Sequence, residues 1–106
     1  MGNGGFSLSV SSRGNDFVIG GSGVLDVNGM ASLRLALEES CKTEGAVVSL
    51  DLSAVSRLDP GVVNSLIEAG DFCRGLDVPF SVTVNVDVLA VLSAAGYGSE
   101  LLPLVL

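Results

Sequence analysis

The stretch from Val47 to Ala69 reads VVSLDLSAVSRLDPGVVNSLIEA and decides the fold. Apolar and polar residues alternate in its first part, so that Val48, Leu50 and Leu52 share one side of an extended chain. Both sides carry apolar residues, as in a strand that lies inside a sheet. We therefore predict a central strand over residues 46–52, followed by a short loop.

Asp59 is expected to start a helix directly after this loop. Its carboxylate can accept hydrogen bonds from the free N–H groups of a first helical turn. Pro60 suits the first helical position, where the N–H that it lacks would have no partner. Gly75 is expected to end the helix. One apolar stripe recurs at helical spacing: Val62, Leu66, Ala69 and Cys73.

Further elements are expected on both sides of this unit. Two alternating segments, Phe6–Val10 and Phe17–Val24, predict a hairpin with its turn at residues 13–16. The run from Gly20 to Gly23 lacks the spacing of a nucleotide-binding loop and indicates a bulged or flexible strand. The remaining expectations are a helix from Asp26 to Glu44 ended by Gly45, a strand over Phe80–Val86, a helix capped by Asp87 and ended by Gly96, and an apolar tail, Leu101–Leu106, docked on the core.

The order of these elements is β-β-α-β-α-β-α. Helices separate the later strands, which predicts parallel pairing through right-handed crossovers, while the first hairpin adds an antiparallel edge. We expect a single α/β domain over residues 1–106, with a mixed, mostly parallel sheet and helices packed against it.

Composition narrows the functional classes. The net charge is −7, and the five cationic residues are scattered, so a nucleic-acid partner is disfavoured. An acidic surface would suit a basic protein partner. The chain has no apolar run long enough to span a membrane and no recognisable secretory signal, which favours a cytoplasmic location.

The sequence offers little catalytic chemistry. It contains no histidine, and Cys41 and Cys73 lack the spacing of metal ligands. Each cysteine falls in an apolar helical pattern, and we expect both to be reduced thiols. No nucleophile with a neighbouring base can be identified. We therefore expect a non-enzymatic protein with no metal and no cofactor.

Several segments, in order, resemble the pattern of STAS domains, the fold of bacterial anti-sigma factor antagonists. The segments are Gly23–Asp26 (GVLD), Val48–Ser53 (VSLDLS), the loop at Asp59, Leu92–Tyr97 (LSAAGY) and Glu100–Pro103 (ELLP). The resemblance covers nearly the whole chain. It implies a transcription regulator that works by binding a protein.

The resemblance also implies a binding site. In the family, the loop after the central strand and the start of the next helix form the docking face. The matching residues here are Arg57, Asp59, Pro60, Gly61, Val62 and Ser65.

A phosphorylation switch lies in the same loop of the family, where Asp-Ser-Ser/Thr/Ala-Gly is usual and a kinase modifies the hydroxyl two residues after the Asp. That position falls on Gly61, or is deleted if Gly61 is aligned with the glycine of the motif, and neither alignment leaves a hydroxyl. Ser56 and Ser65 are the nearest alternatives, and structural roles account for both more simply. The switch is therefore expected to be missing.

Two classes of function follow from the resemblance. The first is a protein-interaction module that binds an anti-sigma factor or a kinase-like partner without the usual phosphorylation switch. The alternative is an accessory subunit of a lipid-transport ABC system, or a module that senses a small ligand or nucleotide. Neighbouring genes would separate the two classes. The oligomeric state does not follow from the sequence.

Overall fold

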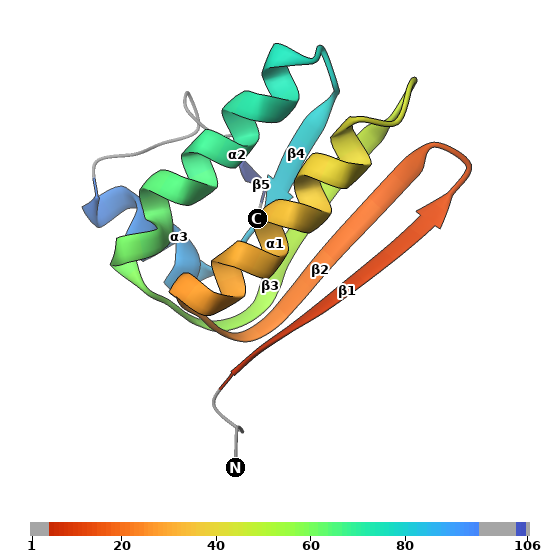
Figure 1. Cartoon of the computed structure of the whole chain (residues 1–106). Coiled ribbons are helices and arrows are strands. Elements are labelled where there is room, and N and C mark those ends of the chain that lie inside the picture. The colour runs from red at the N-terminus through yellow and green to blue at the C-terminus, as the bar shows by residue number, and fades with distance from the viewer. Residues whose placement is uncertain (1–4, 96–103, 106) are drawn as a thin grey trace.

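Five strands form one mixed sheet in the order β1-β2-β3-β4-β5 (Figure 1). The structure is a computed structural model that describes residues 5–95 and 104–105. β1 pairs with β2 antiparallel, and the other neighbouring strands pair in parallel. This order confirms the predicted mixed sheet, with the hairpin at one edge and the strand containing Leu50 at the centre. The strands are β1 (Phe6–Arg13), β2 (Asp16–Leu25), β3 (Val47–Leu58), β4 (Phe80–Thr83) and β5 (Leu104–Val105).

Helices α1 and α2 lie side by side against one face of the sheet (Figure 1). The helical elements are α1 (Val27–Cys41), the single 3-10 turn η1 (Pro60–Val62), α2 (Val63–Gly75) and α3 (Val86–Ala94). α1 ends at Cys41 instead of Glu44, and Gly45 adopts a φ of +75° in the turn before β3. The predicted helix end at Gly96 and the predicted docking of Leu101–Pro103 lie outside the described residues. None of the helices in the described chain is long and apolar enough to cross a membrane.

The hydrophobic core lies between the helices and the sheet. The side chains of Val48, Leu50 and Leu52 in β3 are completely buried there. Residues that alternate with them, such as Ser49 and Asp51, are half-buried on the other face of the sheet. The helices contribute a second set of buried side chains: Met30, Leu33, Leu37, Val62, Val63, Leu66, Ala69, Val88 and Leu92.

β3 is longer than expected, because the predicted loop at residues 53–58 continues the strand. Between Gly20 and Val24 of β2 the pairing with β3 shifts twice, and β3 gains one residue at each shift. Such bulges change which side chains face the core. As a result Leu52, Val55 and Leu58, which are spaced three residues apart, are all buried, whereas a regular strand buries every second residue.

The glycines of β2 make room for the ring of Phe6. A Cβ on Gly21 would lie 2.3 Å from that ring, and a Cβ on Gly29 of α1 would lie 2.8 Å from the Phe6 Cβ. Gly23 has a φ of +89°, a conformation that favours glycine. The run from Gly20 to Gly23 is therefore a strand segment with irregular pairing, as predicted, and its glycines also have a packing role that was not predicted.

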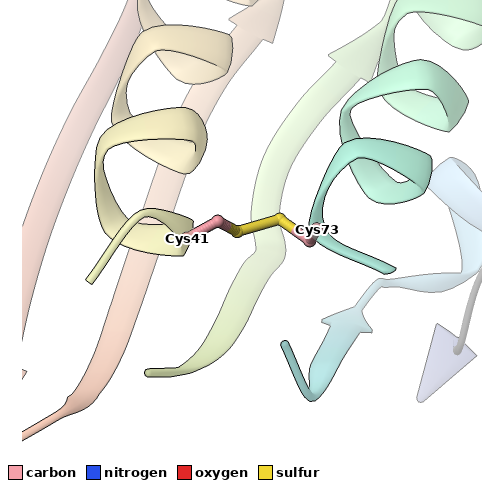
Figure 2. Close-up of a disulfide and its surroundings, with 2 residues drawn as sticks. All are labelled: Cys41 and Cys73. Atoms are coloured by element: carbon pink, nitrogen blue, oxygen red, sulfur yellow. A yellow bond between two sulfur atoms is a disulfide. The ribbon is translucent and has the colours of Figure 1, made fainter. Parts of the chain in front are cut away.

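A disulfide joins Cys41, the last residue of α1, to Cys73 in the last turn of α2 (Figure 2). The two Cα atoms are 5.7 Å apart, within the usual range for this bond. The prediction that both cysteines are reduced thiols is therefore wrong. Both do face the core, but the parallel crossover brings the ends of the two helices together over a separation of 32 residues.

Candidate functional site

The candidate site begins at the turn between β3 and α2. Asp59 has an extended backbone, and its Oδ1 accepts a hydrogen bond of 2.9 Å from the Gly61 amide. Pro60 occupies the first position of η1, and the Val62 amide donates to the carbonyl of Asp59 at 3.0 Å. Asp59 therefore caps a helical start, as predicted, although a 3-10 turn separates the cap from α2.

The turn is also tied to the neighbouring strand. The Asp59 amide donates to the carbonyl of Leu25, the last residue of β2, at 3.0 Å. Asp26 follows Leu25 and caps α1, since its Oδ1 accepts a 2.9 Å hydrogen bond from the Gly29 amide. Asp26 thus caps α1 and Asp59 caps the 3-10 turn before α2, and the two helical segments begin side by side because they follow the carboxyl ends of adjacent parallel strands.

An open hollow of about 280 Å³ lies between these two helix starts. Its floor is apolar, and Val27 at the rim has 67% of its surface exposed. Such an exposed apolar residue beside a hollow is a candidate contact for another protein. The lining residues are Val27, Met30, Ala31 and Arg34 from α1, and Gly61, Val62 and Ser65 from the other side.

The predicted docking residues occupy different environments. Pro60 and Gly61 are exposed, Ser65 is half-buried, and the side chain of Val62 is only 1% exposed. Val62 therefore supports the turn from the core and offers little surface to a partner. Arg57 is exposed on β3, next to the turn but outside the hollow.

The α1 side of the hollow was missed from the sequence. Val27, Ala31 and Arg34 lie more than twenty residues before the turn, and only the parallel pairing of β2 with β3 brings them beside it. The available signal was the apolar Val27 at the start of α1, although Leu35 of the same helix is exposed as well.

Arg34 connects the two walls of the hollow. Its guanidinium lies 3.2 Å from Glu38 in α1 and 3.3 Å from Glu68 in α2. Surface ion pairs of this kind add little to stability. They place the guanidinium and two carboxylates together at the rim, so that charged groups border the apolar floor.

The two hydroxyl groups nearest to the turn lie in different elements. Ser56 is exposed on β3, and Ser65 lies in the first turn of α2 at the wall of the hollow. A Cβ added to Gly61 would meet only the Asp59 carboxylate, at an ordinary contact distance of 3.4 Å. The backbone therefore accepts a serine at position 61, even though the sequence has none there.

Asn85 was not identified from the sequence, where Asp87 was expected to cap α3. The structure shows that this expectation is wrong, because the Asn85 Oδ1 accepts a hydrogen bond of 2.8 Å from the Val88 amide. Its Nδ2 donates to the carbonyls of Ser53 at 3.0 Å and Val55 at 2.8 Å. Asn85 therefore fastens the start of α3 to the bulged part of β3.

Comparison with known proteins identifies the fold. The sequence matches no protein-family model and no curated protein. An anti-sigma factor antagonist from Mycobacterium paratuberculosis has a similar crystal structure, with a TM-score of 0.76 and 18% identity over 96% of this chain and 86% of that chain. The anti-sigma factor antagonist SpoIIAA, in its unphosphorylated form, gives a TM-score of 0.67 and 16% identity over 87% of this chain and 81% of that chain. The chain therefore has the fold of anti-sigma factor antagonists, the STAS fold, as its sequence predicted.

Proposed function

We propose that the chain is a non-enzymatic protein-interaction module that binds an anti-sigma factor or a kinase-like regulator and so controls bacterial transcription. The observation that carries the proposal is the turn Asp59–Gly61, half-buried at Asp59 and exposed at Pro60 and Gly61, beside an apolar hollow with a charged rim. The shared fold with anti-sigma factor antagonists supports the choice of partner.

The docking surface of this proposal consists of the turn Asp59–Gly61, with Arg57 and Ser65 beside it, and the α1 residues Val27 and Arg34. It combines an acidic cap, an apolar floor and a guanidinium. A partner with a basic group for Asp59 and an apolar side chain for the hollow would fit these features, because buried apolar contact supplies affinity and charge supplies orientation.

The proposed module lacks a phosphorylation switch at its turn. No residue from Asp59 to Asn64 carries a hydroxyl group. Phosphorylation would add about 1.5 to 2 negative charges beside Asp59 and oppose docking. Without that chemistry, control would come from abundance, competition or a bound ligand.

A cytoplasmic location belongs to the same proposal, since transcription regulators act there. The disulfide between Cys41 and Cys73 bears on this point, because such bonds are rare in reducing cytosol. Alkylation of thiols in intact cells, followed by mass spectrometry, would show whether the bond is present where the protein works.

Binding to a histidine-kinase-like anti-sigma factor of the same organism, measured by titration calorimetry, tests the docking surface. Asp59→Ala removes both the cap and the charge, whereas Asp59→Asn keeps an oxygen for the Gly61 amide. We expect both variants to bind at least tenfold more weakly. Asp87→Ala, which removes an exposed acid from α3, should bind like wild type. If folded Asp59→Asn bound as well as wild type, the acid would have no role in docking.

The missing switch is tested with the same partner and ATP. Intact-mass spectrometry should find no phosphate on the native chain, and Gly61→Ser should gain one, because a side chain fits at that position. A stoichiometric phosphate on Ser56 or Ser65 of the native chain would show that the switch has moved.

A further inference from the structure

Strand β1 forms one edge of the sheet, and no described strand pairs with its outer side. An unpaired edge is a template for a further strand, and proteins usually block it with charges, prolines or bulges. The span Phe6–Ser12 contains no charged residue and no proline, and its pairing with β2 is regular. This edge is therefore open to another extended chain.

The hairpin geometry shows which backbone groups point outward. Arg13 and Asp16 close the two-residue turn Gly14–Asn15, and Gly14 has a φ of +62°. In such hairpins the closing pair is hydrogen bonded, and bonded and non-bonded pairs then alternate along the strands. The backbone N–H and C=O groups of the odd-numbered residues of β1 thus point towards β2. The hydrogen bond from the Val24 amide to the Gly5 carbonyl follows the same alternation. The outward amides belong to Phe6, Leu8, Val10 and Ser12.

The side chains of β1 alternate in the same way. Phe6 and Leu8 are half-buried on the face that carries the helices, and Val10 on this face is 52% exposed. The opposite face carries the hydroxyl groups of Ser7, Ser9 and Ser11, all exposed. The strand therefore presents one apolar row and one hydroxyl row along the same open edge.

This pattern is complementary to itself in the antiparallel direction. If Leu8 lies opposite Leu8 of a second copy, Phe6 lies opposite Val10 and Ser7 lies opposite Ser9. Apolar side chains then meet apolar side chains, hydroxyl groups meet hydroxyl groups, and the outward amides pair with outward carbonyls. A register shifted by one residue would place the outward amides opposite residues of the second copy whose backbone groups already bond to β2, and these pairs would be lost.

We propose that β1 pairs with β1 of a second copy of this chain, antiparallel and with Leu8 opposite Leu8, so that one sheet runs through both subunits. A protein of net charge −7 repels its own copies, but the uncharged span at the edge keeps acidic groups out of the contact. Added salt screens the remaining repulsion and should strengthen the dimer.

Sedimentation equilibrium tests the proposal at protein concentrations from about 10 µM to about 1 mM, because an edge contact is small and therefore weak. Wild type should show a monomer–dimer equilibrium. Val10→Lys should weaken it at least tenfold. Val18→Lys is the matched control, because Val18 is 45% exposed in β2 and away from the edge, and it should leave the equilibrium unchanged.

Amide hydrogen exchange locates the contact. In the monomer the amides of Ser7, Ser9 and Ser11 should be protected by β2, whereas those of Leu8 and Val10 should exchange quickly. Raising the protein concentration should increase the protection of the Leu8 and Val10 amides only. Val10→Pro removes one outward donor without breaking a bond to β2, and it should abolish the protection. A monomer throughout the concentration range, or equal weakening by Val10→Lys and Val18→Lys, would overturn the proposal.

Discussion

Asp51 and Ser53 form a local hydrogen-bonded pair on the open face of the sheet. Asp51 Oδ1 accepts from the Ser53 hydroxyl at 2.6 Å and from the Ser53 amide at 2.9 Å. These bonds, the hydroxyl bond most strongly, lower the pKa of Asp51 below its ordinary value of 3.8, while partial burial opposes them. The charged form of Asp51 is thus favoured in the folded protein.

Ser53→Ala should raise the pKa of Asp51 towards 3.8, because only the amide bond remains. A carboxylate whose pKa is lowered by folding stabilises the protein above its unfolded pKa, and this contribution is lost as the pH falls through the folded pKa. The variant should therefore lose less stability than wild type on acidification below about pH 4. Carbon NMR titration of the Asp51 carboxyl measures the shift. Ser49→Ala, a neighbour without this bond, is the control, and an equal shift there would refute the assignment.

Strand β3 supports the fold from the centre of the sheet. Leu50 is completely buried, so Leu50→Ala should leave a cavity and lower the free energy of unfolding by about 2–5 kcal/mol. Ser49→Ala changes the adjacent residue on the other face and should cost much less. Urea denaturation of both variants provides the comparison. A loss below about 1 kcal/mol for Leu50→Ala would be too small for a central strand.

The first half of β3 was predictable and the second half was not. Residues 48, 50 and 52 alternate with polar neighbours, which is the ordinary signal of a strand. After Leu52 the buried residues recur every third position, because each bulge adds one residue. A spacing of three departs from the alternation of a regular strand, and the strand was predicted to end at Leu52.

Asn85 links α3 to β3 through both ends of its amide group. Asn85→Asp keeps an acceptor for the Val88 amide but replaces the two bonds to the Ser53 and Val55 carbonyls with repulsion. Leaving such groups unpaired costs about 1–3 kcal/mol, so this variant should be less stable than wild type despite its intact cap. Thermal unfolding measures the loss. If Asn85→Asp matched wild type, the cap alone would account for the role of Asn85.

The fold was predicted more completely than the hollow beside the turn Asp59–Gly61. Element order and short connections determine a parallel sheet with few alternatives, and the strand order agrees. The surface depends on residues that are distant in sequence, such as Val27 and Gly61, which meet only after β2 and β3 have paired. The disulfide was missed for the same reason, because nothing in the sequence near Cys41 indicates that Cys73 lies next to it.

The disulfide should contribute strongly to the stability of so small a domain. Closing a loop of this size removes chain entropy from the unfolded state, worth about 3–4 kcal/mol. The double variant Cys41→Ala/Cys73→Ala should lose about this amount in urea denaturation. Reductant should destabilise wild type and leave the double variant unchanged. Two free thiols per chain in unreduced protein, measured by a thiol assay, would contradict the bond.

The bond between Cys41 and Cys73 also closes a covalent ring, and β3 and the turn Asp59–Gly61 lie inside it. Exposed turns are preferred sites of proteolytic cleavage. A single cut at this turn would open the ring without separating its two halves, which would still migrate together on a gel until reduced. The strands of the sheet would remain hydrogen bonded to their neighbouring strands after the cut. The ring thus holds the domain together after a nick at this turn, where Pro60 and Gly61 are exposed.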